Sequence, residues 1–210
     1  MAKVRPLYVP APYQDAADSG RLILQDGTTA QIRIAKSEDL EKLLAFFQRL
    51  SPEARWRRFF SMGVPPRDFI RKLCDSSNLA SDLTLIVTSI WHGEDNIIAT
   101  GSYQALEPSG DQKTAEVAFA VDDAFHRKGL GTLLLERLAV LAARQGFVRF
   151  WAVTHADNRP MIEVFQNSGF AIKEKQESGT VEVELSVIPG EEFLAKSEMR
   201  DRVATSASMR

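Results

Sequence analysis

Alternating hydrophobic and polar positions recur along the chain, and this period of two predicts strands that bury one face. The predicted strands cover residues 22–24, 30–34, 83–91, 97–106, 115–121, 147–154, 170–175 and 181–187. Short polar or glycine-containing segments join the first two, the next two and the last two strands, as they do in hairpins. The pattern therefore predicts a sheet that begins and ends with a hairpin.

Helical spacing of hydrophobic positions predicts helices between these strands. The predicted helices cover residues 38–49, 52–60, 67–74 and 129–145, with a short helix that opens at Asn158. Ser37 and Ser51 are suitable N-caps, Pro52 suits a first helical position, and Gly146 is expected to end the long helix. The predicted order is two or three early helices followed by β-β-β-α-β-α-β-β.

Length and composition restrict the class of protein. The chain has 210 residues, 44% of them hydrophobic, and a net charge of −2, which suits one soluble domain and gives no basic excess for nucleic acid. No apolar run approaches a membrane span or a signal-peptide core, so no membrane partner is expected. The single cysteine, Cys74, suits a reducing cytoplasm, and it is expected to pack in the core rather than act as a nucleophile or acyl carrier. Three scattered histidines have no metal-ligand spacing, so no metal is expected.

Three regions are expected along the chain. Residues 1–20 contain three prolines and little periodicity, which indicates a loosely attached N-terminal arm. Residues 21–188 carry the predicted strands and helices and are expected to form one domain. Residues 189–210 are charged and are expected to be a poorly packed tail or linker.

A glycine-containing basic loop connects the strand ending at Val121 to the long helix. Its sequence is His126-Arg127-Lys128-Gly129-Leu130-Gly131-Thr132. Free N–H groups and the positive end of the helix dipole attract anions at such a place, and glycine lets a phosphate approach the backbone. No lysine follows Gly131, which excludes a P-loop, and Leu134 replaces the third glycine of a dinucleotide fingerprint. The loop is therefore predicted to hold a different pyrophosphate, unless it is only a helix start with solvated cations.

This loop resembles the Gln/Arg-x-x-Gly-x-Gly/Ala loop of the GNAT superfamily of acyl-CoA-dependent N-acyltransferases. A second feature of that superfamily, an Asn that opens a helix ending in Gly-Phe, is matched by Asn158 and by Gly169-Phe170. The resemblance covers about residues 22–188 and implies the GNAT fold, a mixed α/β (α+β) fold whose central twisted mixed sheet is flanked by helices. His126 stands where the family usually has Gln or Arg, and the change is expected to be tolerated because that position acts through its backbone.

The resemblance implies acetyl-CoA as cosubstrate. Its diphosphate is expected on the basic loop, at His126, Arg127, Lys128, Gly129, Leu130, Gly131 and Thr132. Its pantetheine amides are expected to pair with the backbone of Phe119, Ala120 and Val121, because neighbouring parallel strands splay there in this fold. Asn158 either bonds the pantetheine arm or caps its helix. Phe165 replaces a tyrosine that many members use to protonate the leaving thiolate, and it is either a wall of the pantetheine channel or core.

The resemblance also points to a base. Attack on a thioester needs a neutral amine, so a group that removes the proton of the amine is useful. Glu116 occupies the position of the catalytic glutamate in the lysine acetyltransferases that the chain resembles. The alternative is a solvent-facing strand glutamate in a cross-strand ion pair.

The early helices resemble a narrower group. Leu50-Ser51-Pro52-Glu53 followed by Arg58-Phe59-Phe60 is similar to a signature of bacterial protein lysine acetyltransferases. Those enzymes modify acyl-CoA synthetases, and some are fused to an ADP-forming acyl-CoA synthetase-like region. Residues 202–209 are similar to the linker that leads into that region. The implied activity is direct acetyl transfer to a protein lysine, with an acyl-CoA synthetase as partner. A small-molecule amine N-acetyltransferase and a catalytically silent acyl-CoA-sensing module remain alternatives. The arginines at 55, 57 and 58 either receive an acidic protein or are solvated beside core aromatics.

Overall fold

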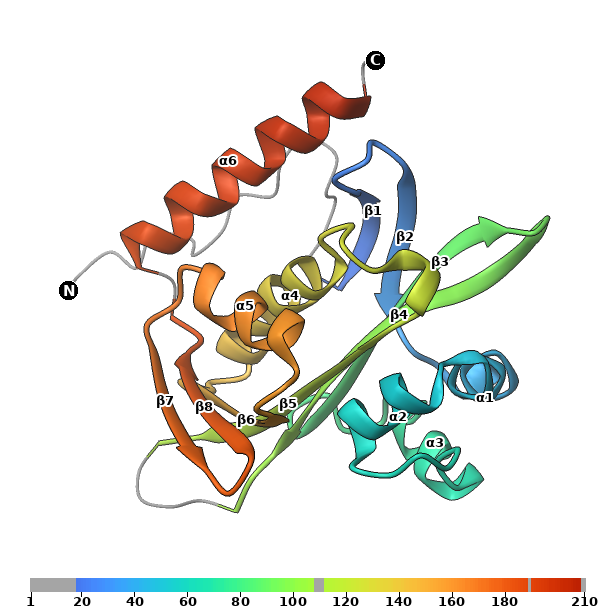
Figure 1. Cartoon of the computed structure of the whole chain (residues 1–210), viewed down its shortest axis with the longest axis horizontal. Coiled ribbons are helices and arrows are strands. Elements are labelled where there is room, and N and C mark those ends of the chain that lie inside the picture. Colours follow the sequence, from blue (N-terminus) through green and yellow to red (C-terminus); the bar gives the residue numbers. More distant parts are fainter. Residues whose placement is uncertain (1–17, 108–111, 189, 209–210) are drawn as a thin grey trace.

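One sheet runs through the molecule, with the strand order β1-β2-β3-β4-β5-β6-β8-β7 (Figure 1). The computed structural model of the chain describes residues 18–107, 112–188 and 190–208, so nearly all of the predicted N-terminal arm lies outside the described residues. The strands are β1 (Ser19–Ile23), β2 (Thr29–Ile34), β3 (Asp82–Trp91), β4 (Glu94–Ala105), β5 (Thr114–Val121), β6 (Arg149–His155), β7 (Ile172–Glu177) and β8 (Thr180–Ser186). Each predicted strand is present, with its ends shifted by a few residues.

Helices cover both faces of this sheet. They are α1 (Leu40–Arg49), α2 (Pro52–Phe59), α3 (Arg67–Leu73), α4 (Leu130–Arg144), α5 (Arg159–Asn167) and α6 (Glu191–Ser208), with short 3-10 turns η1 (Ser37–Asp39) and η2 (Asp123–Phe125). Figure 1 shows α1, α2 and α3 on one face and α4, α5 and α6 on the other. This arrangement confirms the predicted mixed α/β fold with a flanked central sheet.

The backbone pairing between β5 and β6 is short. These two strands are parallel, and their ladder has only the pairs Thr114–Arg149, Ala115–Phe150 and Glu116–Trp151. All other neighbouring strands are antiparallel. Because β5 continues to Val121 and β6 to His155 without further pairing, the two strands diverge beyond Glu116, as the resemblance implied.

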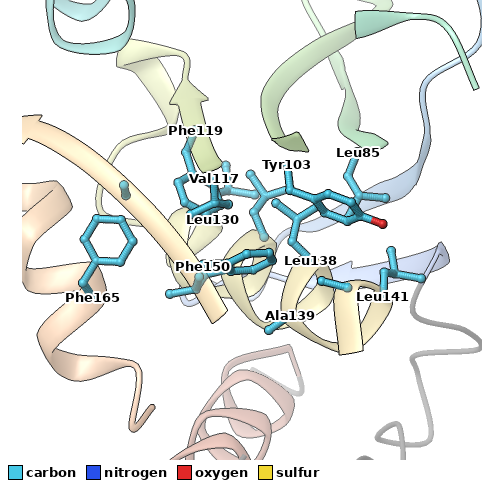
Figure 2. Close-up of a cluster of buried hydrophobic side chains, with 14 of the residues drawn as sticks. Leu85, Tyr103, Val117, Phe119, Leu130, Leu138, Ala139, Leu141, Phe150 and Phe165 are labelled. Carbon is cyan, nitrogen blue, oxygen red and sulfur yellow. The ribbon is translucent and has the colours of Figure 1, made fainter. Parts of the chain in front are cut away.

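Hydrophobic side chains fill the space on each face of the sheet. The larger core lies under α4, where Tyr103, Val117, Leu138 and Phe150 pack together (Figure 2). The second core lies under α1 and α3 and contains Phe46, Phe47, Ile70, Ile86 and Cys74, among others. Burial, with a further contribution from the charge of Asp39, raises the pKa of the Cys74 thiol to about 11. This setting fits the predicted packing role of Cys74, because a protonated buried thiol is a poor nucleophile.

The start of α1 differs from the prediction. Ser37 was predicted to be the N-cap, but it begins the turn η1, and α1 starts three residues later at Leu40. The buried carboxylate of Asp39 causes the difference, since it accepts a hydrogen bond from the Lys36 N–H at 2.8 Å and is bound by both terminal nitrogens of Arg33 at 2.6 Å.

The C-terminal segment also differs from the predicted poorly packed tail. Residues from Glu191 form α6, and Phe193 is fully buried with its ring stacked on Phe170 at 4.3 Å. Gly169 makes this contact possible because a Cβ there would lie 2.8 Å from the Cα of Phe193. The charged composition of the segment gave no indication that Phe193 would be buried. The packing of Phe193 on Phe170 docks the first turns of the helix.

Candidate active site

A cavity of about 670 Å³ opens where β5 and β6 diverge. Its walls come from β5, the loop before α4, β6 and α5, and from the end of α1 and α2 on the opposite face of the sheet. The lining includes most of the predicted site residues: Phe119, Ala120, Val121, His126, Arg127, Gly129, Leu130, Gly131, Thr132, Asn158 and Phe165. Lys128 and Glu116 are outside the lining. The size suits a site for a small molecule or cofactor.

The edge of β5 offers unpaired backbone groups to this cavity. Asp122 N–H donates to the Ile98 carbonyl on β4 at 2.9 Å, and the Thr114 carbonyl accepts from Leu106 on the same side. Backbone groups alternate in direction along a strand, so even-numbered residues of β5 face β4 and odd-numbered ones face β6. The N–H and C=O groups of Phe119 and Val121 therefore face the opening. Those of Ala120 face β4, so Ala120 contributes only its side chain.

The loop before α4 forms a backbone cradle. Leu133 N–H makes a hydrogen bond of 3.1 Å to the Gly129 carbonyl at the start of the helix, which leaves the N–H groups of Leu130, Gly131 and Thr132 without intrahelical acceptors. All three residues line the cavity. Such N–H groups at a helix N-terminus favour an anion. The loop can therefore accept an anion, and the diphosphate of acetyl-CoA on it stays a prediction.

The two glycines of the loop also have roles in the fold itself. Gly129 adopts a φ of 82°, which favours glycine, and a Cβ there would lie 3.2 Å from the Gln25 side chain. A Cβ on Gly131 would lie 3.1 Å from Cγ2 of Val164 on α5. Gly131 thus allows α4 and α5 to approach closely, and its role in phosphate access stays a prediction.

The two cations of the loop point to different places. Arg127 lines the cavity, whereas the Lys128 ammonium forms an ion pair of 2.8 Å with Asp26 and lies over the Phe125 ring. Although burial opposes the change, hydrogen bonds from Lys128 and Thr28 lower the pKa of Asp26 to about 2. Lys128 therefore anchors the loop to the β1–β2 turn.

His126 binds the end of β5. Its Nε2 lies 3.1 Å from the Val121 carbonyl oxygen, which is one of the groups on the open edge. In this arrangement the imidazole occupies a position that a ligand amide would otherwise contact. The side chain of His126 thus has a specific partner, in addition to the backbone role that the resemblance implied.

Asn158 and Phe165 place α5 against the cavity. The Asn158 side chain makes no capping hydrogen bond to α5, and its Nδ2 donates to Oγ1 of Thr154 at 2.8 Å. Its orientation therefore disfavours the capping alternative. Phe165 is 1% exposed, meets Phe119 edge-to-face at 6.3 Å and lines the cavity, so it is both core and wall.

Glu116 lies at the edge of the site on the α2 side. It is exposed and shares a face of β5 with Ala118 and Ala120, both of which line the cavity. Its place in the last pair of the β5–β6 ladder puts it where the strands begin to diverge. Among the ion pairs found between described residues none involves Glu116, so the predicted cross-strand alternative is not seen.

The arginines of α2 are not equivalent. Arg55 holds the turn after α1, donating to the carbonyls of Leu50 at 2.6 Å and Met62 at 2.7 Å. Arg57 lines the cavity and pairs with Glu53 at 2.5 Å. Arg58 also lines the cavity, and burial, partly opposed by the charge of Glu116, lowers the pKa of its guanidinium to about 10.

The aromatic residues of this segment were considered as core residues, and the structure agrees with this for only one of the three. Phe59 packs edge-to-face on Phe47 at 5.2 Å, as a core residue does. Trp56 and Phe60 are 39% and 41% exposed and hold the ring of His155 between them, at 4.9 and 4.3 Å. These contacts fix the C-terminal end of α2 against β6.

The described residues contain no group of three or more His, Cys, Asp or Glu that could hold a metal ion. No described helix is long and apolar enough to cross a membrane.

The chain also matches a known family. The sequence profile of the acetyltransferase (GNAT) family matches residues 43–170, more than half of the 210 residues. This chain belongs to the GNAT acetyltransferase family. The assignment confirms the predicted GNAT acetyltransferase domain.

Individual relatives extend this assignment. Acetyltransferase Pat of Mycolicibacterium smegmatis is 28% identical over 165 residues, which are 79% of this chain and 48% of that protein. The chain thus spans about half the length of this relative. The putative phosphinothricin acetyltransferase YwnH of Bacillus subtilis is 36% identical over 142 residues, which are 67% of this chain and 83% of that protein.

Solved structures of this GNAT fold agree. The crystal structure of the GNAT domain of S. lividans PAT has a TM-score of 0.71 and 28% identity, and the match covers 85% of this chain and 99% of that one. YncA from Salmonella typhimurium, solved with its cofactor acetyl-CoA, has a TM-score of 0.61 at 19% identity and covers 76% of this chain and 95% of that one. The second similarity is one of fold.

Several lining residues were not predicted from the sequence. They include Gln25, Leu50, Ala54, Thr154, Met161 and Val164, with Arg57 and Arg58 considered only as part of a basic cluster. Most are ordinary apolar residues with no chemical signal. Arg58 did carry a chemical signal in the sequence. It stands next to Phe59 and Phe60, where a solvated cation would be unusual.

Proposed function

We propose that this domain transfers the acetyl group of acetyl-CoA to the ε-amine of a protein lysine. The observation that carries the proposal is the position of the cavity, which joins the open edge of β5 to the α2 side of the sheet through the gap between β5 and β6. A thioester arm that pairs with the backbone of Phe119 and with the N–H of Val121, whose carbonyl contacts His126, directs its reacting end towards Glu116. An amine then enters from the α2 side.

The cosubstrate is held mainly by backbone groups in this proposal. The diphosphate lies on the N–H groups of Leu130, Gly131 and Thr132 beside Arg127, and charge-assisted bonds of this kind contribute roughly 1.5–3 kcal/mol each. The pantetheine amides pair with β5 as an additional strand. Asn158 offers its amide oxygen to the same arm while its Nδ2 stays bound to Thr154.

The chemical step is direct attack. The amine nitrogen forms a bond to the thioester carbonyl carbon, its proton passes to Glu116 directly or through water, and the C–S bond breaks. A thiol of pKa about 8.5 leaves tolerably as a thiolate, so the absence of a tyrosine at Phe165 is acceptable. Glu116 is assigned as base because it is the acidic residue on the β5 face that is directed towards α2 where the strands diverge.

A protein lysine is the preferred acceptor for two reasons. The Leu50–Phe60 segment resembles protein lysine acetyltransferases, and two relatives at 28% identity carry the name Pat. An acyl-CoA synthetase is the proposed partner on the strength of that resemblance, and the reaction is placed in the cytoplasm. The similarity to YwnH supports a second candidate, acetylation of a small-molecule amine.

The deciding experiment supplies labelled acetyl-CoA to the purified protein together with a cell lysate. Label in a protein band, lost with Glu116→Gln, supports the proposal. Label that remains in the small-molecule fraction supports the second candidate. Binding of acetyl-CoA without transfer to any amine would contradict both and identify a silent sensor.

A further inference from the structure

The guanidinium of Arg58, which lines the cavity, is incompletely hydrogen-bonded. Its Nε is buried without a hydrogen-bond partner, and its Nη2 reaches only Oγ of Ser102, at 3.5 Å. The guanidinium also lies 4.8 Å from the ring of its neighbour Phe59. Desolvating a cation without an anion in contact costs free energy, so this arrangement needs an explanation.

Glu116 does not provide the missing contact. Its charge favours the cationic form of Arg58, but within the described part of the chain no ion pair joins the two side chains. Among the described residues, the guanidinium of Arg58 is therefore left without an anion in contact.

The other arginines of α2 have partners that Arg58 lacks. Arg55 is bound to backbone carbonyls, and Arg57 is paired with Glu53. The remaining α2-side lining is apolar, with Leu50, Ala54 and Ala118 among its members. Of the two α2 arginines that line the cavity, Arg58 is thus the one without a carboxylate partner among the described residues, and it lies on the side towards which Glu116 is directed.

We propose that Arg58 binds a carboxylate of the acceptor, so that the acceptor is recognised as an amine with a carboxylate close by. A planar guanidinium binds a carboxylate through two parallel hydrogen bonds, and this contact is strongest where water is excluded. The amine of the same acceptor then faces Glu116. This inference rests on the proposed acetyl transfer and specifies its acceptor.

Two sources supply this chemistry. One is a protein lysine with an acidic residue next to it, and the other is a free amino acid with its own α-carboxylate. Each source has a matched probe pair that differs only in the carboxylate. The peptides acetyl-Gly-Lys-Glu-Gly-amide and acetyl-Gly-Lys-Gln-Gly-amide represent the first source, and norleucine and 1-aminopentane represent the second.

The test compares kcat/KM within each pair for the wild type, Arg58→Met and Arg58→Lys. The wild type is expected to prefer the carboxylate-bearing member of one pair by about tenfold or more, and the pair that shows the preference identifies the source. Arg58→Met should abolish the preference, and Arg58→Lys should retain part of it. A wild type that acetylates amines without preference in either pair would overturn the inference and leave acetyl transfer standing.

Binding provides a readout that does not need turnover. N-acetylnorleucine and N-acetylpentylamine are titrated by calorimetry into the protein saturated with CoA, and acetylated forms of the two peptides are used in the same way. A carboxylate-dependent gain in affinity that Arg58→Met removes supports the inference even if no transfer occurs, in which case only the proposed acetyl transfer fails. Equal affinities within both pairs in the wild type would overturn it.

Melting temperatures distinguish a structural role of Arg58 from the proposed role in binding the acceptor. Arg58 is half-buried and has no carboxylate partner among the described residues, so Arg58→Met should leave the melting temperature unchanged or raised. The control is Arg71→Met on α3, which removes an exposed arginine paired with Asp68 and should keep the carboxylate preference. A fall of many degrees in Arg58→Met, with the preference intact in Arg58→Lys and in refolded Arg58→Met, would show that Arg58 serves the fold and would overturn the proposal.

Discussion

Arg49 and Asp122 join the end of α1 to the end of β5. Arg49 Nε donates to Oδ2 of Asp122 at 2.7 Å, and its Nη2 donates to the Ile97 carbonyl at 2.6 Å. The next residues repeat the connection, because the N–H and Oγ of Ser51 both donate to the carboxylate of Asp123, at 3.0 and 2.9 Å. The helix pair that frames the acceptor half is thereby fixed to the strand that enters the basic loop.

Asp122→Ala is expected to destabilise the fold strongly. Asp122 is buried, and its loss leaves the partly buried Arg49 without its anion, a change that typically costs about 3–5 kcal/mol. Urea unfolding followed by circular dichroism measures the free energy. The control is Asp68→Ala, which breaks an exposed pair with Arg71 and should cost less than about 1 kcal/mol. Equal small losses would show that Arg49–Asp122 is not a structural link.

Arg127→Gln is expected to weaken acetyl-CoA binding by about tenfold or more, because a charge-assisted bond to the diphosphate is lost. Lys128→Gln is the matched variant, one residue away. Since Lys128 pairs with Asp26 outside the cavity lining, its loss should weaken binding much less. Calorimetry with acetyl-CoA gives both affinities, and a larger loss for Lys128→Gln would mean that the lysine turns towards the ligand.

Glu116→Gln tests the base. The substitution keeps the shape and removes the proton acceptor, so turnover should fall by roughly 10²–10⁴ while acetyl-CoA affinity stays nearly constant. Rates are measured from pH 6 to 9 with the acceptor that the lysate experiment identifies. Equal rates for the two proteins across this range would rule out Glu116 as the base.

The Asp26–Lys128 pair makes stability depend on acid pH. The pKa of Asp26 in the fold is about 2, below its ordinary value of 3.8, so the ionised form stabilises the fold above pH 4. This contribution is lost as the pH falls from about 4 to 2. Melting temperatures over this range should fall less steeply for Asp26→Asn than for the wild type. Lys128→Gln should flatten the curve in the same way, and an unchanged curve in both variants would contradict the pair.

Gly169→Ala tests the docking of α6. The new Cβ would lie 2.8 Å from Cα of Phe193 at a φ of 86°, so both strain and overpacking are expected, at about 2–4 kcal/mol in total. Gly179 is the control because it has a φ of 83° with nothing within 4 Å of an added Cβ. Gly179→Ala should show only the backbone strain, about 1–2 kcal/mol. Equal losses in chemical unfolding would mean that the Phe193 contact contributes nothing.

The sequence predicted the fold well because its signals are local. Alternation located every strand, and Ser51 caps α2 as expected through the N–H of Ala54 at 3.1 Å. The predictions were wrong where contacts between residues far apart in the sequence determine the local structure. Asp39 replaced Ser37 at the start of α1 because Arg33 on a neighbouring strand binds it, and Phe193 turned a charged tail into a docked helix.

The candidate site divides in the same way. The basic loop and Asn158 carry recognisable motifs, so most of the residues that line the proposed cosubstrate half could be named from the sequence, whereas Lys128 lies outside the lining. The acceptor half is assembled from residues of α2 and β5, which are far apart in the sequence, so no motif shows that Arg58 and Glu116 are directed to the same place. No motif shows which edge of a strand the backbone N–H and C=O groups of a residue face. Only the pairing of β5 with β4 shows that these groups of Ala120 face β4, whereas those of Phe119 and Val121 face the cavity.

The open edge of β5 has a consequence for how such proteins diverge. Its hydrogen-bonding groups belong to the main chain, and every residue except proline supplies the same pair. Under the proposed binding mode, substitutions can therefore change the side chains along this strand while the thioester arm keeps its main-chain partners. Selection on the acceptor acts on side chains such as those of α2, so one half of the site can drift towards new acceptors while the other continues to bind the same cosubstrate.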